Sequence, residues 1–207
     1  MPSKNILKLD VADSYYHVYA RGANRQKIFR SPEDFVKFLQ LFERYLSLKE
    51  TKNSIGISFP NYFNKVELNS FCLMPNHFHL LIFQRQQGSM TQFMRGLMTS
   101  YSMYFNKKYK RTGPLFESRY KASMISDDAY LEHISRYIHL NPHDWRHYEY
   151  SSLPYFMQQI SDEWIRPERI LAQFKTPDEY LKFVQDYEQH KELLDILKHE
   201  LADQAGV

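Results

Sequence analysis

Cysteine is almost absent from this sequence, since Cys72 is the only one among 207 residues. One thiol cannot form an intrachain disulfide framework or supply the ligands of a cysteine-rich zinc site. Long apolar runs are also missing, and no stretch approaches the roughly 20 residues that a membrane-spanning helix needs. The opening segment, MPSKNILKLD, lacks the apolar core of a secretory signal. These absences predict a cytoplasmic protein with no membrane partner.

Charge and length exclude less. The chain carries 27 Lys and Arg against 24 Asp and Glu, and this net charge of +3 decides little without its placement. The sequence shows neither an internal repeat nor a low-complexity tract. A length of 207 residues suits one domain with an appendage. We predict a domain over residues 1–150 and a helical C-terminal extension over residues 151–207.

Hydrophobic periodicity predicts strands that alternate with helices. Strands are expected over residues 15–20, 65–74 and 77–83, and an extended segment over 113–125. Amphipathic helices are expected over residues 31–50, 89–109, 127–140 and 176–201. Ser31 is the expected N-cap of the first helix, with Pro32 at its first position. This pattern predicts an α+β fold in which helices cover an antiparallel sheet.

Two histidines stand one residue apart in MPNHFHLLIF, residues 74–83. Side chains alternate along a strand, so His77 and His79 share one face. Apolar residues occupy both faces and predict a central strand covered on both sides: Leu81 and Phe83 beside the histidines, and Phe78, Leu80 and Ile82 opposite. A buried imidazole needs a hydrogen-bond partner, a metal or a charged ligand. The pair alone fits core histidines and metal ligands equally, and a metal site needs a third ligand from elsewhere.

The segment RYIHLNP, residues 136–142, places Tyr137 and Asn141 four residues apart. Both lie on one face of the predicted helix if it extends to Asn141. A tyrosine one turn before an oxygen ligand would bring a phenolic nucleophile beside a bound cation. Tyr130 and Ile134 share this face, however, and most tyrosines at helical spacing pack in the core. Spacing alone therefore favours packing for Tyr137.

Several segments, taken in order, resemble one known family. MPNHFHLLI with the downstream RYIHLNP resembles the single-tyrosine HUH transposases, in particular the IS200-type and REP-associated tyrosine transposases. YYHVYARGANRQKIF, residues 15–29, is similar to the family's first strand and loop. RTGPLFESRYKASMI, residues 111–125, is similar to the segment before its catalytic helix. The similarity covers roughly residues 12–145, and so identifies the predicted domain of residues 1–150 as an HUH nuclease domain.

The resemblance implies roles for four residues. His77 and His79 would bind a divalent cation, Mg²⁺ or Mn²⁺, and Tyr137 would be the nucleophile. Asn141 falls where relatives place a polar third ligand. The family cuts single-stranded DNA next to a hairpin, forms a 5′-phosphotyrosine and leaves a 3′-hydroxyl that reverses the reaction. Its members are usually homodimers, so the expected partners are hairpin-bearing single-stranded DNA and a second copy of the chain.

Six residues are expected to contact the DNA: Arg21, Asn24, Arg25, Arg111, Arg119 and Lys121. The first three lie in the turn after the first strand, where Gly22 allows a close approach of the backbone. Arg119 and Lys121 share a face if their segment is extended. A solvated helix end explains the basic stretch around Arg111 equally well. His17 is expected to be a satisfied core histidine rather than a support for a metal ligand.

Three functions remain open on the sequence alone. The first is a DNA strand-transferase that uses Tyr137. The second is a metal-dependent phosphodiesterase that shares the histidines but uses activated water in place of the tyrosine. The third is a domesticated DNA-binding protein that keeps the fold and has little or no catalysis. The sequence favours the first, because both histidines, the tyrosine and a plausible third ligand are all present.

Overall fold

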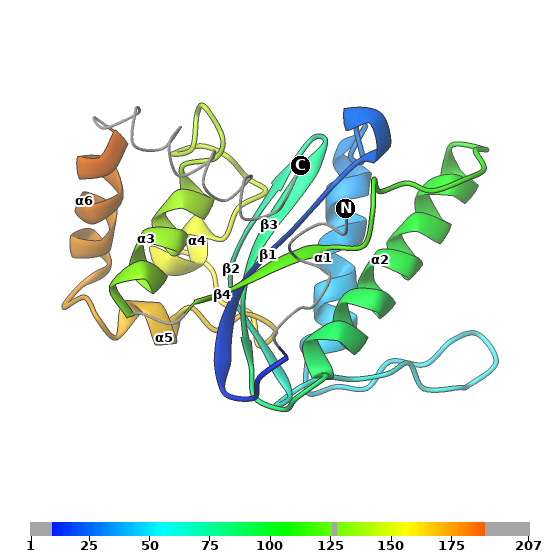
Figure 1. Ribbon diagram of the computed structural model, residues 1–207, viewed down its shortest axis with the longest axis horizontal. Coiled ribbons are helices and arrows are strands. Elements are labelled where there is room, and N and C mark those ends of the chain that lie inside the picture. Colours follow the sequence, from blue (N-terminus) through cyan, green and yellow to red (C-terminus); the bar gives the residue numbers. More distant parts are fainter. Residues whose placement is uncertain (1–9, 126–127, 189–207) are drawn as a thin grey trace, which may run out of the picture.

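A four-stranded antiparallel sheet forms the centre of the computed structural model, which describes residues 10–125 and 128–188 (Figure 1). The spatial order is β2-β3-β1-β4, and the strands are β1 (Ser14–Arg21), β2 (Val66–Met74), β3 (His77–Gln84) and β4 (Lys121–Ile125). Neighbouring strands all pair antiparallel. The α+β fold with an antiparallel sheet is thus confirmed.

Helices cover the sheet on both faces (Figure 1). One face packs against α1 (Pro32–Leu46) and α2 (Ser89–Lys108). The other packs against α3 (Asp128–His139), which is joined by α4 (Leu153–Phe156), α5 (Glu168–Leu171) and α6 (Pro177–Glu188). A short 3-10 helix, η1 (Ala23–Arg25), follows β1. Within the described residues, no helix combines the length and the apolar character that crossing a bilayer requires.

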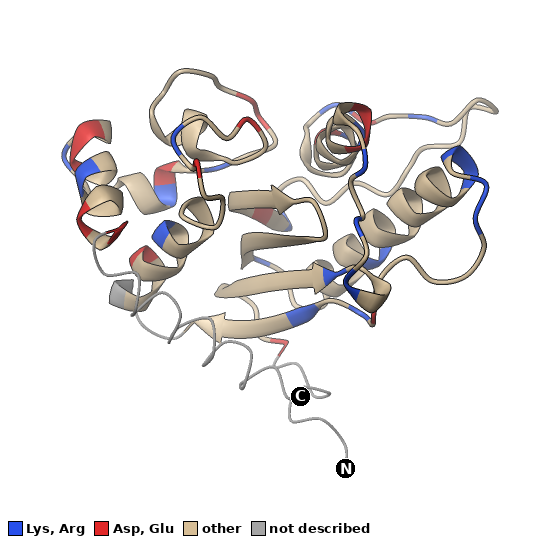
Figure 2. Cartoon of the chain, turned by 90° about the horizontal axis from the view of Figure 1, so that it is seen from above, with Lys and Arg blue, Asp and Glu red and all other residues tan. Residues whose placement is uncertain are grey.

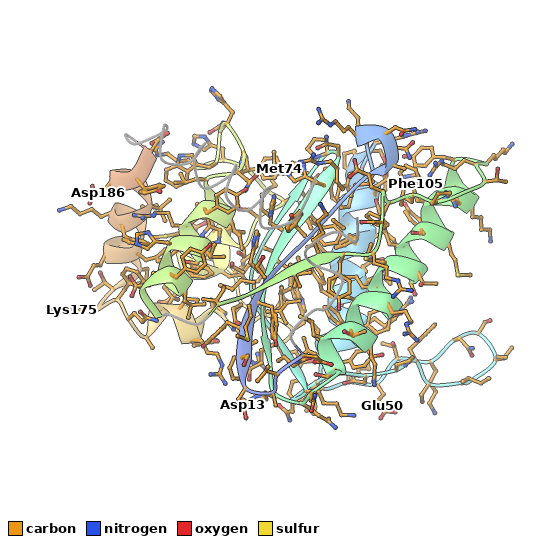
Figure 3. The ribbon with its side chains drawn as sticks, in the orientation of Figure 1. Asp13, Glu50, Met74, Phe105, Lys175 and Asp186 are labelled. Carbon is orange, nitrogen blue, oxygen red and sulfur yellow. The ribbon has the colours of Figure 1, made fainter. Side chains whose placement is uncertain are left out.

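The alternation along β3 divides the interior into two hydrophobic cores. Phe78, Leu80 and Ile82 belong to the core beneath α1 and α2. Leu81 belongs to the second core, beneath α3. Side chains crowd the space on both sides of the sheet (Figure 3). The prediction of a central strand covered on both faces is therefore confirmed, and the histidines of β3 face the layer that contains α3.

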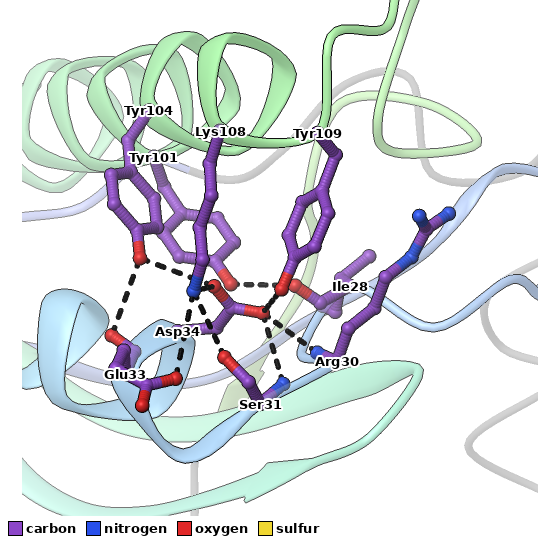
Figure 4. Close-up of polar contacts among 9 residues, drawn as sticks. All are labelled: Ile28, Arg30, Ser31, Glu33, Asp34, Tyr101, Tyr104, Lys108 and Tyr109. Carbon is purple, nitrogen blue, oxygen red and sulfur yellow. Dashed lines mark hydrogen bonds and ion pairs between the residues drawn. The ribbon is translucent and has the colours of Figure 1, made fainter.

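A buried carboxylate joins the start of α1 to the end of α2 (Figure 4). Asp34 is fully buried. Its two oxygens accept hydrogen bonds from Lys108 Nζ at 2.7 Å, Tyr109 Oη at 2.7 Å and the Arg30 and Ser31 backbone amides at 2.8 and 3.1 Å. Burial acts to raise the pKa of Asp34, but these hydrogen bonds and the charge of Lys108 outweigh it and hold the pKa below its ordinary value. Asp34 thus fixes both helices against the same face of the sheet.

The segment after residue 149 covers the outer edge of β2. The amide of Leu73 donates to the Tyr150 carbonyl, and the amide of Ser152 donates to the Phe71 carbonyl, both at 2.9 Å. Further along, the Arg166 amide donates to the Leu68 carbonyl at 2.8 Å. A covered edge cannot pair with a foreign strand. The boundary at residue 150 stays a prediction, but the described part of the C-terminal extension lies directly against the sheet.

Element boundaries differ from the sequence predictions at several points. Ser31 precedes α1 as expected, with Pro32 as its first residue. Only residues 121–125 of the expected extended segment form a strand. Two short helices, α4 and α5, were not predicted, because one turn is too short to show a period. The predicted helix over residues 176–201 is observed as α6 up to Glu188, and the remainder lies outside the described residues.

Asp34→Ala should lower the free energy of unfolding by about 2–4 kcal/mol at pH 7, because it removes several charge-assisted hydrogen bonds at once. The folded pKa of Asp34 lies below the unfolded value of about 3.9, so this stabilisation is complete above that value and is lost as the pH falls through the folded pKa. Urea unfolding of both proteins at several pH values measures the difference, which should shrink toward pH 3. The neighbouring exposed carboxylate provides the control, since Glu33→Ala should change stability far less than Asp34→Ala does.

Candidate active site

The register of three strands gathers polar side chains on the face beneath α3. In the first row, His77 on β3 pairs with Arg21 on β1. In the second row, His79 pairs with Tyr19, which pairs in turn with Lys121 on β4. Paired residues of antiparallel strands point to the same side. The two histidines expected to bind metal therefore share a face with Arg21 and Lys121, two of the residues expected to contact DNA.

Helix α3 places Tyr137 against the histidines. The ring of Tyr137 meets the His79 ring edge-on, with centroids 5.5 Å apart and an interplanar angle of 88°. It meets the His17 ring in the same way at 5.9 Å. Tyr137 is also part of the core beneath α3, together with Ile134 and Ile138. Tyr137 thus packs in the core and also lies against the rings of His79 and His17.

The environment of Tyr137 opposes its ionisation. Burial raises the pKa of the phenol, whereas a hydrogen bond with the Asn141 side chain and the charge of Arg21 both act to lower it. Burial is the largest of these effects and the net change is upward. Burial also raises the pKa of Tyr19 to about 12. The Tyr137 phenol therefore needs positive charge beyond that of Arg21 before it is an effective nucleophile at neutral pH.

Asn141 lies just beyond the end of α3. The helix ends at His139, and the Asn141 amide continues the turn with a hydrogen bond to the Ile138 carbonyl at 3.4 Å. Its side-chain Nδ2 donates to the Tyr137 carbonyl at 3.2 Å. The amide oxygen Oδ1 is then the atom that Asn141 would offer to a cation. Its role as third ligand stays a prediction.

The described residues contain no group of three His, Cys, Asp or Glu side chains arranged to hold a metal ion. The expected set is of a different kind, since its third member is an amide. Both histidines use Nδ1 for a protein contact: His77 Nδ1 lies 2.7 Å from Asn76 Oδ1, and His79 Nδ1 lies 2.9 Å from His17 Nε2. Nε2 is therefore the atom each imidazole would offer, and two such nitrogens with an amide oxygen fit a divalent cation, Mn²⁺ better than Mg²⁺.

Arg21 ends β1, and Asn24 and Arg25 follow it in η1. Lys121 begins β4 and pairs with Tyr19, two residues before Arg21. The Gly22 amide donates to the Asn76 carbonyl at 2.8 Å, which ties η1 to the turn that precedes His77. A β-carbon at residue 22 would lie 2.2 Å from the Gln26 carbonyl oxygen, so only glycine fits this close approach. Asn24 and Arg25 line an open hollow with Ala23 and Glu117.

The remaining two expected DNA contacts lie elsewhere. Arg119 is in the exposed segment before β4. Arg111 donates to Asn106 Oδ1 at 3.1 Å and to the Pro114 carbonyl at 3.3 Å, so it holds the loop that follows α2. Basic residues at the ends of β1, β4 and α2 nevertheless lie toward the same end of the molecule (Figure 2). Contact with DNA stays a prediction for all six residues.

Comparison with known proteins identifies the family. A model of the family described as "Transposase IS200 like" matches residues 10–141. The chain belongs to the IS200-like transposase family. The matched region of this transposase begins before β1 and ends at Asn141, so it contains both histidines and Tyr137.

One solved structure agrees with this membership at the level of the fold, and a second is similar to a lower degree. The structure of a REP-associated tyrosine transposase bound to a REP hairpin matches with a TM-score of 0.50 and 13% identity, over 70% of this chain and 80% of that chain. A crystal structure described as a transposase from Deinococcus radiodurans R1 matches with a TM-score of 0.40 and 16% identity, over 61% and 89%. No curated protein matches the transposase in sequence.

Sequence reasoning missed a buried histidine that supports the tyrosine helix. His139, fully buried at the end of α3, contacts Tyr180 Oη on α6 through Nδ1 and Ser152 Oγ through Nε2, each at 2.7 Å. Burial lowers the pKa of His139 to about 3. On the outer side of α3, the Arg136 guanidinium lies 3.7 Å from the Tyr187 ring centroid. The C-terminal extension therefore holds the helix that carries Tyr137.

His139→Leu should lower the free energy of unfolding by about 1–3 kcal/mol, because it leaves buried hydroxyl groups short of a partner. Urea unfolding at pH 7 measures this loss. The exposed His147 provides a matched control, and His147→Leu should change stability by less than about 0.5 kcal/mol. Equal effects of the two substitutions would show that the contacts of His139 with α6 and Ser152 add no stability.

Proposed function

We propose that this transposase is a metal-dependent endonuclease and strand-transferase for single-stranded DNA, with Tyr137 as nucleophile and a 5′-phosphotyrosine intermediate. One observation carries the proposal: the Tyr137 ring on α3 lies 5.5 Å from the ring of His79, within a cluster that contains both histidines of the HUH pair and Arg21. A tyrosine held only for packing has no need of such neighbours.

The covalent step follows from the chemistry of a phosphodiester. Tyr137 Oη forms a bond to phosphorus as the bond from phosphorus to the 3′-oxygen breaks. The phenol gives up its proton and the leaving oxygen takes one up, so the products are a 5′-phosphotyrosine and a 3′-hydroxyl. The reverse attack by a 3′-hydroxyl joins strands and releases Tyr137. No external energy source is needed, because one phosphodiester bond replaces another.

His77, His79 and Asn141 would hold the cation through Nε2, Nε2 and Oδ1. A bound Mg²⁺ or Mn²⁺ supplies positive charge that polarises the scissile phosphate and favours the phenolate. All three protein ligands are neutral, so they leave the charge of the cation available to an anionic substrate. Arg21 acts in the same direction, because its charge lowers the pKa of Tyr137.

The DNA is proposed to approach along the basic end of the sheet. Arg21 and Lys121 lie on the histidine face, while Asn24 and Arg25 border the hollow at η1. Phosphate contacts of this kind fix the position of a strand without reading its sequence. The REP-associated transposase of similar fold is bound to a REP hairpin, and a hairpin beside the cleavage site is proposed here as well. A homodimer, implied by the family resemblance, is part of the proposal, and sedimentation velocity measures it.

Tyr137→Phe should abolish covalent capture of DNA while leaving binding intact. Single-stranded hairpin DNA from the flanks of the gene, with a label retained on the 5′-phosphate side of the cut, is incubated with Mn²⁺ and run on a denaturing gel. Wild type should give a labelled protein–DNA band, and Tyr137→Phe, His77→Ala and a chelator should each remove it. Tyr130→Phe is the matched control, since this tyrosine lies on the same helix and should leave the band unchanged.

The other outcomes separate the alternative functions. Cleavage that persists in Tyr137→Phe without a covalent band would point to activated water and a phosphodiesterase. Binding without cleavage by wild type, over several flanking hairpins, would indicate a DNA-binding protein with no turnover. Either result would contradict Tyr137 as the nucleophile.

Arg21→Ala should weaken DNA binding and reduce its salt dependence. Removal of one phosphate contact lowers the slope of log K against log salt by about 0.7 for a single strand. Fluorescence anisotropy between roughly 50 and 200 mM salt measures this slope. Arg146→Ala is the control, because Arg146 pairs with Glu188 at the end of α6 and is not among the residues expected to contact DNA. An unchanged slope in Arg21→Ala would remove Arg21 from the DNA-binding surface.

A further inference from the structure

A fully buried histidine contacts the expected metal ligand from the neighbouring strand. His17 lies at the centre of β1, with 1% of its surface exposed. Its Nε2 is 2.9 Å from Nδ1 of His79. The two ring planes differ by only 5°, and the centroids are 5.1 Å apart. The two nitrogens are in hydrogen-bond contact while the ring centroids are 5.1 Å apart, so the rings meet edge to edge and are not stacked face to face. The hydrogen bond therefore lies near the plane of both rings.

This contact holds one proton, which has two possible positions. If His17 Nε2 carries it, His79 accepts at Nδ1 and its own proton lies on Nε2, the atom expected to bind the cation. If His79 Nδ1 carries it, His17 accepts and His79 Nε2 presents a lone pair. Only the second arrangement allows His79 to act as a ligand, because a protonated nitrogen cannot donate a lone pair to a metal.

The other nitrogen of His17 argues against a packing role. Nδ1 is buried and has no hydrogen-bond partner within the described part of the chain. An unpaired buried polar atom destabilises the fold, and an apolar side chain would avoid that loss. The partner of His17 on β3 is the buried Leu81, against which an apolar side chain could pack. Histidine at this position therefore calls for a role that leucine or valine cannot fill.

We propose that His17 is a positioning residue. Its Nε2 accepts a hydrogen bond from the protonated Nδ1 of His79, and this keeps the lone pair of His79 on Nε2, directed to the cation. This inference rests on the metal site of the proposed function. It corrects the expectation of a satisfied core histidine, because one nitrogen of His17 is unsatisfied and the other contacts a ligand.

The test is the affinity of the purified protein for Mn²⁺ without DNA, measured from the electron paramagnetic resonance signal of free Mn²⁺. His17→Leu removes the acceptor and should weaken binding about 10- to 100-fold. His17→Gln keeps an acceptor oxygen near the position of Nε2 and should stay within about threefold of wild type. Leu81→Ala destabilises the same face without touching the hydrogen bond and should also bind as wild type. Thermal unfolding of each variant confirms that it is folded.

His77→Ala separates the two proposals. If wild type binds Mn²⁺, His77→Ala does not and His17→Leu binds as wild type, the metal site stands and the role of His17 is wrong. The role of His17 is also wrong if His17→Gln binds Mn²⁺ as weakly as His17→Leu does. If neither wild type nor His77→Ala binds Mn²⁺, the metal site itself fails and the role of His17 fails with it.

A spectroscopic signature gives a second, independent readout. Nitrogen-15 shifts of the histidine side chains, recorded with Mg²⁺, report which nitrogen carries the proton. Wild type and His17→Gln should show His79 protonated at Nδ1, and His17→Leu should show a mixture of both forms. A His79 ring that stays fully protonated at Nδ1 in His17→Leu would overturn the proposal.

Discussion

The pairing of β1 with β3 is the constraint on which the candidate site depends. These strands lie 62 residues apart at the contact between His17 and His79, yet their antiparallel register sets His77 beside Arg21 and His79 beside Tyr19. A slip of one residue would turn every side chain of one strand to the opposite face. A slip of β3 would bury its histidines in the apolar core beneath α1 and α2, and this cost opposes the slip. Packing in the core beneath α1 and α2 thus determines which side chains of β3 line the candidate site on the opposite face of the sheet.

The elements that the sequence predicted well are those with a clear period and a local signal. Helix α1 has both, since Asp34 accepts from the Ser31 amide at 3.1 Å and Phe38 and Phe42 are buried. The faces of β3 followed from simple alternation. The extended segment was predicted less well, because most of it is irregular and only Lys121–Ile125 pairs in the sheet. Irregular backbone has no period that a sequence pattern can reveal.

The contacts of two buried histidines could not be predicted, for a different reason. His17 and His139 each gain their partners from distant parts of the chain, at separations of 62 and 41 residues. Neither the register of two strands nor the docking of α6 on α3 can be read from local spacing. Family resemblance supplied the candidate ligands and the nucleophile, but it said nothing of the groups behind them. Those groups came from the packing of strands and helices.

The cover that the C-terminal extension provides has a consequence for how this transposase is shortened. The family match ends at Asn141, so it excludes Ser152 and Tyr180, which contact His139, and the backbone groups that pair with the outer edge of β2. A fragment cut at that limit would expose unpaired amides and carbonyls at the edge of β2. It would also expose the apolar side of α3 that packs against α4, α5 and α6. Both kinds of surface promote aggregation. The region that matches the family and the region that folds stably on its own therefore end at different residues. A fragment made for experiments has to retain α6.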